Sequence, residues 1–147
     1  MNFESYYRKL TDKERNGKPY KYELIGNYVQ RGIDLGDKDL FIRGWVYYRA
    51  SDKSLWITKG YRWDGSTVVL DTKPCMRASA VHDALQQLIN TGKLDRKKYQ
   101  NYADRLYRDI CIEDGMWKIR AYWRYTGLCI KATLDRLFAA SAAKGEK

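Results

Sequence analysis

The only histidine of the chain, His82, stands directly before Asp83 in the segment "RASAVHDALQQL" of residues 77–88. On a helix, His82 lies about 100° around the axis from Val81, at the edge of the apolar stripe. A histidine beside carboxylates is the residue set of a general base that activates water or a serine. The same set binds divalent metals, and it also occurs as a buried structural pair. All three roles fit the pattern.

Two other segments supply neighbours for this pair. The turn "WDGST" of residues 63–67 either presents polar groups at the end of a strand or bonds its own backbone as an Asx-turn. In "YADRL", residues 102–106, the aspartate follows an apolar helical position, so it lies at the rim of the interface with the helix of the histidine. The pattern therefore predicts one polar site. Its catalytic candidates are Asp64, Ser66, His82, Asp83 and Asp104.

Within this site, Asp64, His82 and Asp104 are the candidate metal ligands, because carboxylates with one imidazole suit a divalent cation such as Mg²⁺ or Mn²⁺. Zinc is not expected, because the chain has one histidine and no closely spaced cysteine pair. The tandem His-Asp also marks metal-dependent phosphohydrolases of the HD type. Those enzymes need further histidines as ligands, so the sequence excludes that class and leaves the cofactor open.

The charge of the chain points to negatively charged partners. It has 28 Lys and Arg residues against 18 Asp and Glu residues, a net charge of +10. This excess attracts an anionic ligand or polymer, such as nucleic acid, or an acidic host protein. The alternative is that the charge serves solubility, with long basic side chains covering apolar surface. The ligand-binding candidates near the motifs are Trp63, Thr67, Arg62, Arg77 and Arg105.

The cysteines and the apolar segments indicate the compartment. Cys75, Cys111 and Cys129 are an odd number without a CxxC motif, which fits a reducing environment better than a disulfide framework. The N-terminal segment is charged and lacks the apolar core of a signal peptide. No stretch approaches the length of a membrane-spanning helix. We therefore expect a cytoplasmic protein.

The first half of the chain has the composition of a β-sheet. Residues 19–30, 40–50 and 55–63 are rich in Tyr, Ile and Val, with partial alternation of apolar and polar positions. A polar loop and a short turn separate the three predicted strands. Gly44 and Gly60 indicate bulges or close backbone approaches.

The second half has the 3.6-residue period of amphipathic helices. Because proline does not fit inside a helix, we expect the first helix to begin after Pro74, near Met76 or Arg77, and to end at Gly92. Asp95 is a good N-cap for the second helix. The third helix is predicted over residues 116–140, with a bend or break at Gly127.

Together these elements predict a single α+β domain over residues 1–147. Residues 18–70 are mainly β, residues 76–141 are mainly α, and the tail of residues 142–147 is expected to fray. We expect an N-terminal antiparallel sheet of three or more strands, followed by three helices packed on one face.

The motifs, which begin with "GYRWDGST" and end with "RAYWRYTGL", resemble a small family of uncharacterised phage- and prophage-associated proteins. The resemblance covers roughly residues 60–127, and Gln86 stands where the family has an aromatic residue. It implies a phage origin, the host cell cytoplasm as the setting, and a polar cluster that recurs as a unit. The family has no established activity. The matching positions are Trp63, Asp64, Gly65, Ser66, Thr67, Arg77, His82, Asp83, Ala103 and Asp104.

Three functions fit these observations. The first is a hydrolase-like phage accessory protein that uses the predicted polar site. The second is a non-enzymatic binder of an anionic ligand, such as nucleic acid, a nucleotide signal or an acidic host protein, in phage–host conflict. The third is a structural or assembly protein of the phage, in which the His–Asp cluster serves only the fold. The residue types favour the first function for the site.

Overall fold

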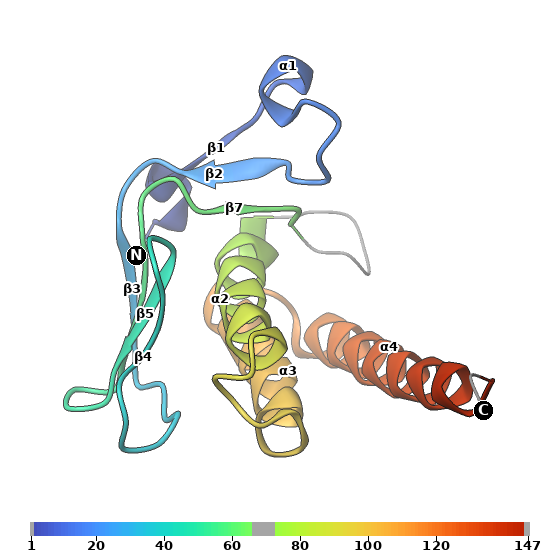
Figure 1. The fold of residues 1–147 in the computed structure, drawn as a ribbon. Helices are drawn as coiled ribbons and strands as arrows, with labels where there is room; N and C mark the ends of the chain where they lie inside the picture. Colours follow the sequence, from blue (N-terminus) through green and yellow to red (C-terminus); the bar gives the residue numbers. More distant parts are fainter. Residues whose placement is uncertain (1, 66–72, 146–147) are drawn as a thin grey trace.

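The computed structural model describes residues 2–65 and 73–145, with side chains described up to residue 142, so the predicted site residues Ser66 and Thr67 lie outside the described part. Within it, seven strands form two antiparallel sheets in the first half, and three long helices follow (Figure 1). The α+β class predicted from the sequence is confirmed, although the strands form two sheets where the sequence predicted one.

The first sheet lies beside the beginning of the helical half. It consists of β1 (Tyr7–Lys9), β2 (Tyr22–Leu24) and β7 (Arg62–Trp63), in the order β1-β2-β7. A 3-10 helix, η1 (Phe3–Tyr6), precedes β1, and the short helix α1 (Asp12–Arg15) connects β1 to β2. Strand β7 runs toward the first long helix (Figure 1). The strand ends at Trp63, which is the first residue of the "WDGST" segment.

The second sheet contains the remaining four strands in the order β3-β6-β5-β4. These are β3 (Tyr28–Arg31), β4 (Leu40–Ile42), β5 (Val46–Arg49) and β6 (Ser54–Ile57). Side chains of β5 alternate between buried and more exposed positions, as expected for a sheet with one face on the core. The register pairs the buried Val46 with the buried Ile57.

Each predicted strand is divided by a turn. Residues 19–30 contribute to both sheets, and residues 40–50 form a hairpin whose turn contains Gly44 with φ +82°. Residues 55–63 also pass from one sheet to the other, turning at Gly60 with φ +91°. Glycine adopts these left-handed conformations without strain. The two glycines therefore lie at turns between strands, where the sequence predicted bulges or close backbone approaches.

Helix α2 (Lys73–Asn90) carries the central motif. It begins earlier than predicted, because Pro74 occupies the first turn, where its missing N–H leaves no helical hydrogen bond unmade. The helix ends before Gly92, which has φ +77°, as predicted. Its buried side packs on α3, η1 and β4.

The next two helices complete the fold. Helix α3 (Arg96–Glu113) begins at the predicted N-cap, where the Asp95 carboxylate accepts a hydrogen bond of 3.0 Å from the Lys98 amide. Helix α4 (Lys118–Gly145) continues through Gly127 without the predicted break. It packs on α3 and extends away from the sheets (Figure 1).

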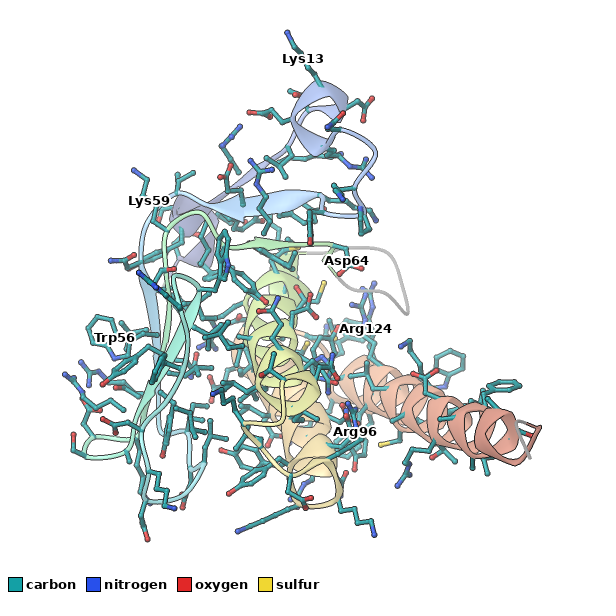
Figure 2. The ribbon with its side chains drawn as sticks, in the orientation of Figure 1. Lys13, Trp56, Lys59, Asp64, Arg96 and Arg124 are labelled. Carbon is teal, nitrogen blue, oxygen red and sulfur yellow. The ribbon has the colours of Figure 1, made fainter. Side chains whose placement is uncertain are left out.

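A single cluster of buried side chains joins the sheets to the helices. Its largest fully buried members are Trp63, Tyr28, Tyr48 and Tyr61. Side chains of the sheets and of α2 meet in the layer between them (Figure 2). Two buried tyrosines place their hydroxyls on polar partners, since Tyr28 donates to Gln30 at 2.7 Å and Tyr48 to the Gly36 carbonyl at 3.3 Å. The tyrosine-rich composition thus supports a core with polar edges.

Candidate functional site

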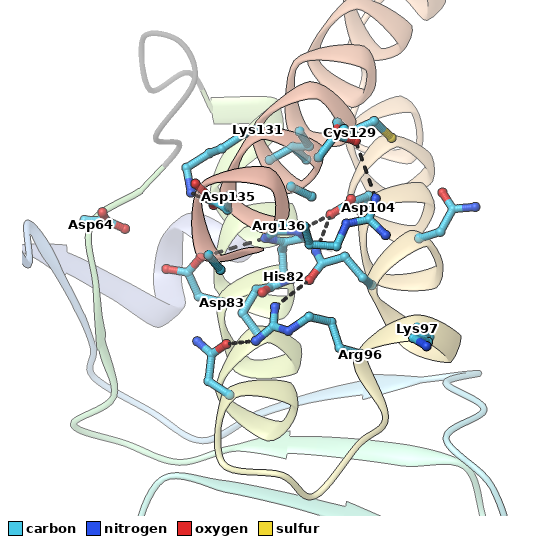
Figure 3. Close-up of a pocket in the computed structure, with 18 residues that line it drawn as sticks. Asp64, His82, Asp83, Arg96, Lys97, Asp104, Cys129, Lys131, Asp135 and Arg136 are labelled. Atoms are coloured by element: carbon cyan, nitrogen blue, oxygen red, sulfur yellow. Dashed lines mark hydrogen bonds and ion pairs between the residues drawn. The ribbon is translucent and has the colours of Figure 1, made fainter. Parts of the chain in front are cut away.

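A cleft of about 860 Å³ lies between α2, α3 and α4, next to the end of β7 (Figure 3). Four of the five predicted catalytic residues line it, namely Asp64, His82, Asp83 and Asp104. They come from three places in the chain: Asp64 follows β7, His82 and Asp83 lie on α2, and Asp104 lies on α3. The fold therefore brings together the described part of the predicted site.

The centre of the site is an ion pair between His82 and Asp104. The Nε2 of His82 lies 2.7 Å from the Oδ1 of Asp104, which also accepts a hydrogen bond of 3.2 Å from Gln100. Burial of His82 acts to lower its pKa, but the hydrogen bonds and charges of Asp104 and Asp83 outweigh burial and raise that pKa to about 9. The raised pKa favours the cationic form of His82 near neutral pH, and the general-base role of His82 stays a prediction.

Asp83 is more accessible than the buried Asp104. Its side chain keeps 29% of its exposure, and its Oδ1 lies 4.0 Å from the Nδ1 of His82. Burial raises the pKa of Asp83 to about 6; the His82 cation acts to lower it, and interaction with the Asp64 carboxylate raises it. A carboxyl group with this pKa exchanges protons near neutral pH, as a general acid–base requires.

Two buried donors beside these carboxylates, the Tyr61 hydroxyl and the Gln86 Nε2, have no hydrogen-bond partner among the described residues. Burial raises the pKa of Tyr61 well above its usual value, and the charges of Asp83 and Asp64 raise it further. Tyr61 therefore stays a neutral donor close to both carboxylates. Gln86 lines the cleft itself. Because buried polar groups in proteins are nearly always satisfied, unpaired donors in a cleft indicate a place for a bound acceptor.

Basic side chains from α3 and α4 form another part of the wall. Lys131 pairs with Asp135 at 3.2 Å, whereas no described carboxylate pairs with Arg96, Lys97 or Arg136. The sequence-based prediction missed these residues. Helical periodicity places residues 128, 132, 135 and 139 on one side of α4. The sequence does not show that this side faces α2 and α3, so it does not predict that the basic residues near it line a cleft.

Four predicted ligand-binding residues lie elsewhere. Trp63 is buried and donates from Nε1 to the Ser79 hydroxyl at 3.0 Å, so it belongs to the core. Arg62 faces Glu23 at 3.7 Å on the first sheet, and Arg77 is held by acidic residues at the end of α3. Arg105 is exposed on α3 and is not part of the cleft wall.

The predicted metal site is not supported by the arrangement of the described residues. Among them, no three His, Cys, Asp or Glu side chains are grouped so that they could hold a metal ion. The Nε2 of His82 lies 2.7 Å from the Oδ1 of Asp104, so this nitrogen already has a partner within the protein. Asp64, His82 and Asp104 thus share a cleft without forming a coordination sphere.

Comparison with known proteins adds no relative to these observations. No protein-family model, curated protein or solved structure matches the chain. The resemblance to the phage-associated family therefore stays a prediction from the motifs. Among the described helices, none is both long and apolar enough to cross a membrane.

Proposed function

We propose that this chain is a phage accessory protein whose cleft hydrolyses a polar substrate by general acid–base chemistry, with Asp83 as the group that accepts a proton from water. The observation that carries the proposal is the shared cleft, in which Asp83 lies beside a second carboxylate, Asp64, and the His82–Asp104 ion pair. The phage origin rests on the sequence resemblance alone.

The chemistry follows from the charges at the site. Ionised Asp83 takes a proton from water as the water oxygen attacks the substrate, and protonated Asp83 returns that proton to the leaving group. Water is thereby added across the broken bond. Cations such as Arg96 and Arg136 on the cleft wall stabilise negative charge that develops on the substrate. His82 is a positioning residue, because its charge orients Asp83 and favours its ionised form.

The direct test is hydrolysis of a panel of nitrophenyl substrates comprising a phosphodiester, a phosphomonoester, a carboxylic ester and a glycoside. We expect turnover of at least one, with Asp83→Asn lowering kcat about 10²–10⁴-fold. Asp109→Asn is the matched control, because Asp109 is an exposed carboxylate on α3 that pairs with Arg108. An inactive wild-type protein, or an Asp83→Asn variant as active as the wild type, would contradict the proposal.

The pH profile separates the positioning role of His82 from a purely structural one. The wild-type rate should rise through an apparent pKa near that of Asp83, about 6. In His82→Gln the neighbouring cation is lost, so the pKa of Asp83 should increase and the profile should move to higher pH. A lower rate with an unmoved profile would show that His82 serves only the fold.

Binding of an anionic ligand without catalysis is the second candidate, and the unpaired Gln86 donor beside Arg96 and Arg136 favours it. The test is fluorescence anisotropy with labelled single-stranded DNA and, as a small competitor, inorganic phosphate. Binding should weaken steeply with salt and in Arg96→Ala/Arg136→Ala. Lys13→Ala and Lys59→Ala are the controls, because these lysines lie away from the cleft (Figure 2). Equal losses in both pairs would indicate non-specific attraction.

A further inference from the structure

Helix α4 displays a stripe of large apolar side chains on its free surface. Trp123 is 77% exposed and Phe138 is 70% exposed. Successive members follow the spacing of one helical side and span about 100° around the axis. The members of this α4 stripe are Ile119, Trp123, Ile130, Leu134, Leu137 and Phe138.

The α4 stripe is not part of the core. The opposite side of the helix carries Ala121 and Arg124, which are buried, and Leu128, which packs against the core cluster. The contacts of α4 are with α3, and its second half extends beyond the rest of the fold (Figure 1). The stripe therefore faces away from the body. An exposed apolar surface of this extent indicates an interaction site.

The charge of α4 specifies the kind of partner. The helix contains a single acidic residue, Asp135, and the whole chain has a net charge of +10. A surface that covers the α4 stripe must therefore tolerate or attract positive charge. The basic residues of the helix are Lys118, Arg120, Arg124, Lys131, Arg136 and Lys144.

A second protein helix fits this stripe poorly. A second copy of α4 would bring two strongly basic helices within a Debye length of about 8 Å. A helical partner of any charge needs apolar side chains repeating every three or four residues, and Thr126 and Thr133 occupy positions of that seam. A lipid surface requires no such register. The two threonine hydroxyls donate to the Tyr122 and Cys129 carbonyls at 2.9 Å, so lipid contact leaves neither hydroxyl unsatisfied.

We propose that α4 binds the surface of an anionic phospholipid bilayer. The α4 stripe enters the boundary between headgroups and acyl chains, with Trp123 at headgroup level. The exposed basic residues beside the stripe, such as Lys118 and Arg120, contact the phosphates, whereas the buried Arg124 does not. The helix lies in the plane of the interface, consistent with its being too polar to cross a membrane. None of the α4 stripe residues lines the cleft, so this proposal does not rest on the chemistry proposed there.

The test is flotation of the full chain with vesicles made of phosphatidylcholine and phosphatidylglycerol in equal parts, with pure phosphatidylcholine vesicles for comparison. The wild type should float with the anionic vesicles, bind the neutral ones more weakly, and dissociate as salt is added. Its tryptophan emission should shift to shorter wavelength on binding. The variant Trp123→Gln/Leu134→Gln/Leu137→Gln should bind at least about ten-fold more weakly, because three apolar side chains that the bilayer would bury are lost.

The control is Phe41→Gln/Trp45→Gln, which removes exposed aromatic residues from the second sheet. Glutamine preserves helix propensity, and thermal unfolding checks that both variants fold. The control should bind anionic vesicles like the wild type. Absence of wild-type binding, or equal binding by the α4 variant, overturns the proposal. The proposal is also overturned if the wild type is a dimer that does not bind vesicles and the α4 variant is a monomer. The stripe would then be covered by a second copy of the chain.

Discussion

Two networks of charged side chains join α2 to the α3 region, and they differ in how completely they are satisfied. Arg77 donates to both carboxylate oxygens of Asp114 at 2.9 Å and to Glu113 at 2.7 Å. Its remaining nitrogen donates to Gln30 at 3.2 Å. The pKa of Arg77 is raised, because these hydrogen bonds outweigh burial. This network has a partner for every guanidinium nitrogen.

The His82–Asp104 network is incomplete by comparison. It lines a cleft, places a carboxyl with a pKa of about 6 next to the His82 cation, and has the unpaired Gln86 donor nearby. Both networks connect α2 to α3 or to the residue that follows it, and the acidic partners of Arg77 are more exposed than Asp104. Complete satisfaction is the property of a structural ion pair, whereas unpaired donors with shifted pKa values are the property of a site.

The largest effect on stability should come from the complete network. Arg77→Met retains the apolar stem but leaves Asp114 without its bidentate partner, so we expect a loss of about 3 kcal/mol in the free energy of unfolding. Urea denaturation followed by circular dichroism measures this loss. The hydrolytic rate per folded molecule should be unchanged. A loss below about 0.5 kcal/mol, the range of ordinary surface substitutions, would show that the network is dispensable.

A substitution in the His82–Asp104 network should lower the free energy of unfolding less than Arg77→Met and should change the ionisation of the site more. Asp104→Asn keeps the side-chain shape but removes the buried negative charge that holds the His82 cation, at a cost of about 2 kcal/mol. Because the chain has one histidine, its ring protons give an unambiguous NMR titration. The pKa of His82 should be about 9 in the wild type and far lower in Asp104→Asn, where burial dominates. An unchanged titration would mean that Asp104 does not control the charge.

The sequence predicts this part of the molecule well, because local signals are strong there. The Asp95 N-cap, the C-terminal end of α2 before Gly92, and the convergence of His82 with Asp104 follow from helical periodicity and capping. The α+β class follows from the same patterns. These features depend on neighbours within a few residues or on the apolar side of each helix, both of which are visible in one sequence.

The remaining features depend on tertiary structure. Trp63 resembles a ligand-binding aromatic in the sequence, but Ser79, sixteen positions further along the chain, satisfies its indole in the core. Arg77 resembles a phosphate ligand until the end of α3 is placed against it. The turn at Gly44 falls within an alternating pattern typical of one strand. In each case the deciding contact joins distant segments, which periodicity does not specify.

The two networks should also differ in their response to pH. The pKa of Asp83 is raised from 3.8 to about 6 and that of His82 from 6.5 to about 9, so the folded state holds more protons than the unfolded state. The stability from Asp83 is complete below pH 3.8 and lost as pH rises through 6. The stability from His82 is complete below pH 6.5 and lost as pH rises through 9.

We therefore expect unfolding free energies to fall by about 2–3 kcal/mol between pH 6.5 and pH 9 in the wild type. Urea denaturation at a series of pH values measures this fall. Arg77→Met should keep the same slope, since arginine does not titrate in this window. His82→Gln should flatten it. A wild-type stability that is constant or rises over the window would show that His82 is not held as a cation.

The smallest expected difference in stability is between substitutions of two glutamines that line the same cleft. Gln100 donates to Asp104 at 3.2 Å, so Gln100→Ala removes a hydrogen bond to a charged group and should cost about 1 kcal/mol. In the described part of the chain the Nε2 of Gln86 has no hydrogen-bond partner, so Gln86→Ala should change stability by less than about 0.5 kcal/mol or increase it. Urea denaturation compares the two variants directly. If Gln86→Ala destabilises as much as Gln100→Ala, the Gln86 amide is already satisfied within the protein. Equal stability together with weaker binding of phosphate or substrate would instead assign that donor to the ligand.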